Sequence, residues 1–238
     1  MPDYGKLNQQ YFASVLERDE PGGPMWALNL MKYRSAAQYE DGRETTLTGQ
    51  EADDAYTPTE QLAAVGARLI MAGQVVHQLV GDDTVWDRIG IAQYPTRAAL
   101  IEMSMRDDFQ EAHHHKEAGM DFTIVMPTFP YVDDPIPPQH SGVDDDVKLL
   151  LQVVMDPVDP EFAAEVDSVR VGRFWVEDRM IGDDRTFGEA RFDLIGPAAV
   201  DELVARGTER DDASYVVIAE MFIDDVARSL TAPDRVLP

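Results

Sequence analysis

Residues 69–103 read LIMAGQVVHQLVGDDTVWDRIGIAQYPTRAALIEM, and this stretch decides the fold. Two strand-like segments rich in Val, Ile and Leu flank a Gly-Asp-Asp turn at 81–83, and an apolar helix follows the Pro-Thr pair. Residues 169–204 repeat this order of strand, turn, strand and helix, with a second Gly-Asp-Asp turn at 182–184. Because one unit occurs twice in the same chain, the sequence predicts an internal structural duplication.

Additional strands are predicted before and after each copy, which gives each half the order β-α-β-β-α-β. This order is typical of the ferredoxin-like unit, an antiparallel four-stranded sheet with helices on one face. The uncovered face of each sheet must be buried, so the fold class is α+β, with two tandem units forming one α+β barrel and the helices outside. The predicted boundaries are a first unit at 1–130 with an N-terminal helix and an insertion loop at 35–57, a Pro/Asp-rich linker at 131–146, and a second unit at 147–238.

The first predicted strand, residues 25–34, has two different faces because successive side chains alternate. One face carries Trp26, Leu28 and Leu30, and we expect it to lie under the helices. The other face is semi-polar, which is typical of a pocket or an interface; it carries Ala27, Asn29, Met31 and Tyr33.

Composition excludes several classes of function. The chain of 238 residues has a formal net charge of −25, which repels phosphate backbones and argues against nucleic-acid binding. It contains no cysteine, so disulfides, thiolate metal sites and a cysteine nucleophile are excluded. No apolar run reaches the length of a membrane span and the polar start does not resemble a signal peptide, so we expect a cytoplasmic protein without a membrane partner.

Cofactor motifs are also missing from the sequence. There is no phosphate-binding loop, nucleophile elbow, His-Glu-x-x-His zinc motif or dinucleotide fingerprint. The consecutive His113, His114 and His115 point about 100° apart on a helix, so the triplet alone does not converge on one metal ion. We therefore predict no metal and no cofactor, with a small molecule as the ligand and a homodimer as a compatible assembly.

Three motifs carry a resemblance to a known family. The strand MWALNLMKYR at 25–34, the QYPTR turn at 93–97 and the HKEAG segment at 115–119 resemble the dimeric α+β barrel superfamily. The similar branch has unknown function and is related to EthD-like, YciI-like and antibiotic-biosynthesis monooxygenase proteins. The resemblance implies a small-molecule cavity between sheet and helices, but it implies no single reaction. Haem is not expected, because the second half has no histidine beyond His140, where haem-binding relatives carry their proximal ligand.

Asn29 is the first candidate for a catalytic residue. A carboxamide in an apolar strand needs hydrogen-bond partners, so it either tethers a neighbouring loop or orients a substrate carbonyl or enolate oxygen. His115 or His77 would then move protons, although a helix-end His115 favoured by the helix dipole and a solvent-facing His77 are equally simple explanations.

Six further residues are predicted to bind the substrate: Met31, Tyr33, Tyr56, Trp86, Tyr94 and Arg173. Two of them also have a structural explanation. Trp86 aligns with Phe187 in the repeat, which favours core packing, and Arg173 alternates with apolar residues in a pattern typical of cross-strand ion pairs.

The leading functional hypothesis is a cofactor-independent monooxygenase, cyclase or isomerase that acts on an aromatic or polyketide-like metabolite. Polarising an oxygen while abstracting a nearby proton is chemistry that an amide and an imidazole can support. The alternative is a non-catalytic small-molecule-binding or structural α+β barrel protein.

Overall fold

The computed structural model describes residues 4–18, 22–56, 58–131, 143–144, 146–158 and 161–231. Most of the predicted linker, including His140, lies outside these ranges.

Each half of the chain forms a four-stranded antiparallel sheet with the same strand order. In the first half the order is β5-β2-β4-β3, and in the second it is β11-β6-β9-β7, so that in both the fourth strand lies beside the first. This is the order of a ferredoxin-like unit. The strands are β2 (Met25–Tyr33), β3 (Arg68–Gly81), β4 (Arg88–Tyr94), β5 (Met120–Pro130), β6 (Lys148–Val154), β7 (Ser168–Val176), β9 (Glu189–Ile195) and β11 (Ser214–Asp224).

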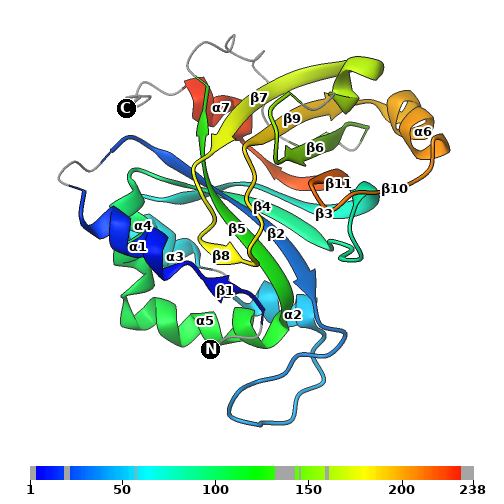
Figure 1. Cartoon of the computed structure of the whole chain (residues 1–238). Coiled ribbons are helices and arrows are strands. Elements are labelled where there is room, and N and C mark those ends of the chain that lie inside the picture. The colour runs from blue at the N-terminus through cyan, green and yellow to red at the C-terminus, as the bar shows by residue number, and fades with distance from the viewer. Residues whose placement is uncertain are drawn as a thin grey trace.

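The two sheets close into one barrel through reciprocal pairings. The second strand of the first half, β3, pairs along β11, the fourth strand of the second half. The fourth strand of the first half, β5, pairs in turn with β7, the second strand of the second half. Figure 1 shows the resulting closed arrangement, with the two halves side by side. The predicted fold class is therefore confirmed.

Most of the helices belong to the first half and pack on the outer face of its sheet (Figure 1). They are α1 (Gln9–Leu16), α2 (Gly49–Ala55), α3 (Thr59–Ala64), α4 (Arg97–Ser104) and α5 (Asp107–Gly119). The second half contributes the short 3-10 helix η1 (Phe162–Glu165), α6 (Pro197–Ala205) and α7 (Val226–Thr231). Among the described residues, no helix is both long and apolar enough to cross a membrane.

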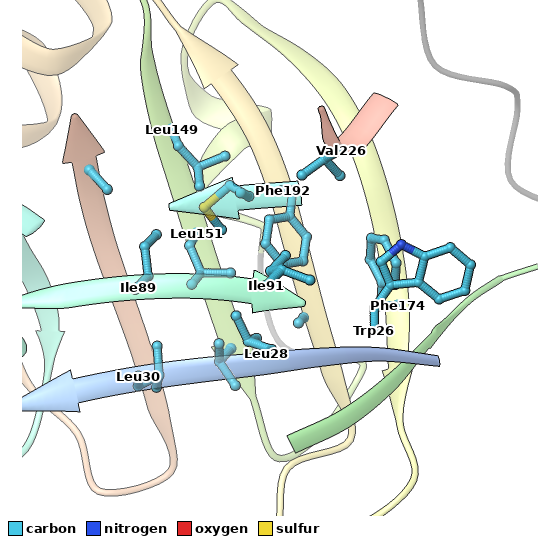
Figure 2. Close-up of a cluster of buried hydrophobic side chains, with 14 of the residues drawn as sticks. Trp26, Leu28, Leu30, Ile89, Ile91, Leu149, Leu151, Phe174, Phe192 and Val226 are labelled. Atoms are coloured by element: carbon cyan, nitrogen blue, oxygen red, sulfur yellow. The ribbon is translucent and has the colours of Figure 1, made fainter. Parts of the chain in front are cut away.

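The barrel interior is filled by apolar side chains from both halves. Trp26, Leu28 and Leu30 point into it, and the Trp26 ring meets the Phe174 ring edge-on with centroids 5.8 Å apart (Figure 2). The expectation that this face of β2 lies under the helices is therefore wrong. Each sheet buries this face against the other sheet, and the helices of the first half cover the opposite face of its sheet. Only α7, of the second half, reaches the barrel interior among the described helices, where its Ser229 accepts a hydrogen bond from Trp26 Nε1 at 3.0 Å.

The predicted insertion loop at 35–57 contains a helix, which corrects that prediction. Helix α2 begins after Thr48, whose side chain accepts a hydrogen bond from the Glu51 backbone N at 3.2 Å. The Glu51 carboxylate accepts one from the Thr48 backbone N at 2.8 Å, which completes a capping box. Gly49 then packs against Gly119 of α5 so closely that a Cβ on either residue would overlap the carbonyl oxygen of the other.

The repeated Gly-Asp-Asp turns have matching backbones. Gly81 and Gly182 both have positive φ, 157° and 150°, a region that favours glycine. One residue later, the carboxylate of Asp82 accepts from the Thr84 backbone N at 2.8 Å, and that of Asp183 accepts from the Arg185 backbone N at 3.0 Å. The sequence repeat is thus a repeat of local hydrogen bonding as well.

A single arginine joins the two turns. The Arg185 guanidinium donates to Asp82 at 2.6 Å and to Asp183 at 2.5 Å. The Tyr215 hydroxyl from β11 donates to the same Asp82 carboxylate at 2.9 Å. The stretch that reveals the duplication therefore also links the two halves.

Candidate functional site

A cavity of about 950 Å³ lies between the outer face of the first sheet and its helices. Strands β2, β3, β4 and β5 form its floor, and α3, α4 and α5 contribute the opposite wall. The short strands β1 (Lys6–Leu7) and β8 (Ile181–Gly182) pair at the edge of the sheet and close one side. The cavity is large enough for a molecule of two or three fused rings.

Small side chains hollow out the floor around Asn29. Asn29 on β2 pairs with Gly90 on β4, and Gly90 pairs with Ala72 on β3. The next cavity-facing pair along these strands is Ala27 with Ala92. Because these neighbours carry at most one side-chain carbon, the space above Asn29 stays open.

Asn29 uses little of its hydrogen-bonding capacity within the protein. Its Nδ2 donates to the Ala27 backbone oxygen of its own strand at 3.1 Å. Within the part of the chain that the structure describes, its Oδ1 accepts no hydrogen bond. The side chain therefore does not tether a described loop, and it keeps one N–H and one acceptor atom for a bound molecule.

His113 of α5 lines the cavity among aromatic rings. Its ring stacks on Phe109 with centroids 5.0 Å apart and meets Tyr56 edge-on at 5.6 Å. Burial, followed by the charges of Lys116 and His114, lowers the pKa of His113 to about 4. The imidazole is therefore uncharged at neutral pH.

The Tyr4 hydroxyl fixes the orientation of this imidazole. It lies 3.2 Å from His113 Nε2 and 3.4 Å from a Glu117 carboxylate oxygen. Since a carboxylate can only accept, the Tyr4 hydroxyl donates its hydrogen bond to Glu117. We therefore assign the imidazole proton to Nε2, which donates to the Tyr4 oxygen. His113 Nδ1 is then unprotonated, and it is buried without a partner among the described residues. Burial, followed by Glu117, raises the pKa of Tyr4, so its hydroxyl keeps its proton.

Lys116 lies one helical turn beyond His113 and also lines the cavity. Its Nζ is 5.6 Å from the centroid of the Tyr56 ring. Burial lowers the pKa of Lys116, while Asp53 opposes that shift. No described residue forms a hydrogen bond or ion pair with its ammonium group.

The other charges of the cavity are paired with one another. Arg88 donates to Asp54 at 2.7 Å and to Asp53 at 3.3 Å. Asp53 also accepts from the Tyr33 hydroxyl at 2.5 Å. Burial, together with the Asp53 carboxylate, raises the pKa of Tyr33, so this hydroxyl remains a donor.

Five of the nine predicted site residues belong to this region. Asn29, Met31, Tyr56 and Tyr94 line the cavity. Tyr33 lies beside it and bonds Asp53, which is a lining residue.

The structure places the other four away from the cavity. His115 is bonded through Nδ1 to the Tyr39 hydroxyl at 2.8 Å, and His77 is exposed on β3 opposite Ile218. Trp86 lies in the barrel core, with its ring 5.7 Å from that of Phe122. Arg173 pairs with Glu189 at 2.7 Å, as a cross-strand ion pair would.

The cavity residues that were not predicted include Tyr4, His113 and Lys116. The spacing of Phe109, His113 and Lys116 at i, i+4 and i+7 places them on one helix face, but the spacing alone does not show that this face lies over the cavity. Tyr4 carried no such signal, since it reaches the site from an extended segment whose path depends on tertiary packing.

Charged side chains fill the part of the second sheet's outer face that β7 and β9 form, whereas the part formed by β6 and β11 is apolar and lies under α6. Glu189 and Arg191 are buried and paired, and Arg191 donates to the Pro157 backbone oxygen at 2.6 Å. Arg170 bridges Asp193 and Glu161 beside them, at 2.6 and 2.8 Å. The two halves of the duplication thus share a backbone plan but have different outer faces.

Comparison with known proteins identifies a relative. No known family model and no curated protein matches the chain. A solved structure, that of the methylated RPA0582 protein, is 32% identical over 57% of this chain and 100% of that chain, with a TM-score of 0.50. The chain belongs to the family of the RPA0582 protein. A second structure of that protein describes it as a protein of unknown function from Rhodopseudomonas palustris.

More distant structural matches include two other kinds of protein. An anthrone oxidase-like protein is 12% identical, over 85% of this chain and 92% of that chain, with a TM-score of 0.45. A chlorite dismutase from Candidatus Nitrospira defluvii is 7% identical, over 92% and 99% of the two chains, with a TM-score of 0.45. Overlays this loose carry no inference about activity, and the link to EthD-like and YciI-like proteins stays a prediction.

Proposed function

We propose that this protein converts a small aromatic or polyketide-like molecule in the cavity by moving a proton from a carbon next to a carbonyl group. The observation that carries the proposal is that an uncharged His113 and a half-used Asn29 amide line the same largely apolar cavity. The reaction needs a proton acceptor and a hydrogen-bond donor for the developing oxygen charge, and these two residues supply them.

The proton-transfer step follows from the two roles. The substrate C–H bond breaks, its proton passes to the His113 imidazole, and the electron pair moves onto the carbonyl oxygen to form an enolate. The remaining Nδ2–H of Asn29 donates to that oxygen. Because most of the lining is aromatic and aliphatic, the local dielectric is lower than that of water, and this hydrogen bond is stronger than it would be in solution.

The same enolate is the first intermediate of three reaction types. Returning the proton to a different carbon isomerises the substrate, and attack on a second carbonyl of the same molecule cyclises it. Reaction with dioxygen as a co-substrate would oxidise it. The cavity chemistry supports the shared first step, which is therefore the step to test.

The test is deuterium exchange at the activated carbon of 2-tetralone in D₂O, followed by NMR. The wild-type protein should accelerate exchange, and His113→Gln should lower the catalysed rate by roughly 100-fold or more. Asn29→Ala should lower it by roughly 10- to 1000-fold, in the range of a lost oxyanion donor. His115→Gln is the matched control, because it alters a histidine of the same helix outside the cavity and should leave the rate unchanged.

Two results would count against the proposal. Exchange at the wild-type rate in His113→Gln would show that His113 is not the base. Equal losses of exchange rate in His113→Gln and His115→Gln would indicate a structural effect. Tight binding without exchange in the wild type would instead favour the second candidate, a non-catalytic binding protein. The specific observation behind that alternative is the Asn29 hydrogen bond to the Ala27 backbone oxygen, which a purely structural amide would also form.

A further inference from the structure

The Lys116 ammonium group lines the cavity and forms no hydrogen bond or ion pair with a residue that the structure describes. It projects from α5 into the cavity, where its described neighbours include the Tyr56 ring. Moving a cation out of water is costly unless an opposite charge or several acceptors replace the water. The nearby acidic side chains do not fill this role, because they are engaged elsewhere.

Each acidic side chain near Lys116 has another hydrogen-bond or ion-pair partner. Asp54 bonds Arg88, and Asp53 is shared between Arg88 and the Tyr33 hydroxyl. The Glu117 carboxylate, next to Lys116 in sequence, accepts from the Tyr4 hydroxyl. Asp53 and Asp54 therefore share Arg88 as their ion-pair partner, and the Lys116 ammonium group, whose pKa Asp53 raises from a distance, forms no ion pair with a described residue.

We propose that the ligand of this cavity is an aromatic anion whose carboxylate, enolate or comparable acidic group pairs with Lys116 while its rings lie among the aromatic side chains. This inference rests on the proposed function only in using the same cavity, and it specifies the class of molecule that binds there. The rings would contact Tyr56 and Phe109, which flank His113. The acidic group would then lie one helical turn from the imidazole that accepts the proton.

Two fluorescent probes of similar shape test the charge preference directly. The anionic probe is 1-anilinonaphthalene-8-sulfonate, and N-phenyl-1-naphthylamine is its uncharged counterpart. Titrations at about 0.15 M salt screen the general repulsion from a protein of net charge −25. In wild-type protein the sulfonate should bind more tightly than the neutral probe.

Substitution of Lys116 should separate the two probes. Lys116→Met should weaken sulfonate binding by roughly 10- to 100-fold, as expected for one lost charge-assisted contact, and change neutral-probe binding by less than about threefold. Lys116→Arg keeps the charge and should retain most of the preference. Lys32→Met is the control, because the Lys32 ammonium group pairs with Asp87 at 3.1 Å and does not line the cavity.

Each other outcome overturns the proposal. Equal weakening of both probes in Lys116→Met would mean that the lysine stem merely shapes the cavity, and no weakening would mean that its charge is not used. The proposal is also refuted if wild-type protein binds the sulfonate no more tightly than the neutral probe. This experiment measures binding and not turnover. If the protein binds the anionic probe selectively but catalyses no proton exchange, the proposed function is refuted and the anion preference still holds.

Discussion

His113 couples the cavity to the stability of the fold. Its folded-state pKa is about 4, against 6.5 for an ordinary histidine, because the buried ring is costly to charge. Between these two values the unfolded chain binds more protons than the folded one, so stability falls as pH falls through this window. Below pH about 4 both states are protonated and the loss is complete.

This linkage can be measured by comparing two melting profiles. The difference of 6.5 − 4 = 2.5 pH units corresponds to about 3 kcal/mol at most, and to less for a ring that keeps some contact with solvent. Between pH 7 and pH 5, wild-type protein should therefore lose about 1–2 kcal/mol more stability than His113→Gln. Parallel profiles of melting temperature against pH would show that His113 titrates normally in the folded protein.

Asn29 and the histidines of α5 differ in how well the sequence alone predicts their position in the site. Asn29 could be placed on the pocket side of its strand, because two-residue alternation next to Leu28 and Leu30 leaves one polar face. A helix turns by about 100° per residue, so selecting His113 over His115 requires the helical phase. That phase depends on the packing of Phe109 against Tyr56, which no short motif encodes.

At the level of elements, the hollow floor of the cavity yields a prediction for β4. A Cβ added at Gly90 would lie 3.5 Å from Met31 Cε and 3.7 Å from the Met71 backbone oxygen, which are ordinary contacts. Gly90→Ala should therefore fold normally. Gly90→Leu places three more carbons in the cavity and should weaken N-phenyl-1-naphthylamine binding at least about tenfold, with little change in melting temperature.

Fluorescence titration of the two variants, alongside thermal melting, checks this prediction. Gly90→Ala serves as the control and should bind the probe within about threefold of wild type. If Gly90→Leu binds the probe as wild type does, the probe occupies another site and the floor around Asn29 is not part of it.

The crossing of α2 and α5 gives a second prediction at this scale. A Cβ at Gly119 would overlap the Gly49 carbonyl oxygen, so Gly119→Ala must push the two helices apart and should cost about 1–3 kcal/mol. Gly196→Ala is the control, because an added Cβ there meets nothing within 4 Å. Calorimetry should show a lower melting temperature only for Gly119→Ala, and equal values for both variants would refute the close contact.

Helix α2 also shows what a sequence can conceal. The signals for it were present, since Thr48 and Glu51 have the spacing of a capping box. They were outweighed by a surrounding segment rich in Asp, Glu, Gly and Thr, which is typical of a loop. What stabilises so short a helix is its contact with α5, through Gly49 against Gly119 and Ala52 against Ala118.

For the whole molecule, Arg185 is the residue that joins the two repeats. It lies between Asp82 and Asp183, and burial of these carboxylates is outweighed by their hydrogen bonds, so the pKa of each is lowered. Arg185→Met would leave two carboxylates close together and should cost about 1–3 kcal/mol near pH 7. This loss should shrink as pH falls through the lowered pKa values, because protonation removes the repulsion.

Chemical denaturation at pH 7 and at a pH below 3.8, the ordinary pKa of an aspartate, checks this behaviour. Arg210→Met is the matched control, because Arg210 pairs with Asp83 of the same turn at an exposed site and should matter little. If the denaturation midpoint of Arg185→Met equals that of wild type at pH 7, the ion pairs of Arg185 with the two turns do not stabilise the barrel.

The duplicated strand order was enough to predict the barrel, because two sheets with one bare face each have few ways to bury it. The inner and outer faces were harder to tell apart. Both faces of β2 are largely apolar, with Trp26, Leu28 and Leu30 on one and Ala27 and Met31 on the other. Only the pairings β3–β11 and β5–β7, which join residues more than forty positions apart, decide which face lies inside.

These pairings imply that the first unit cannot remain a stable monomer when it is alone. A fragment of residues 1–130 would expose the Trp26, Leu28 and Leu30 face and leave the edge of β3 unpaired, which favours association through sheet edges. The RPA0582 protein, which aligns along its full length with 57% of this chain, shows that a shorter relative exists. Sedimentation velocity should find the fragment as a dimer or larger assembly at micromolar concentration, in which a second copy takes the place of residues 147–238. A monomeric fragment that unfolds cooperatively would show instead that one sheet is stable without the other, and that the barrel interior is not what holds the first unit together.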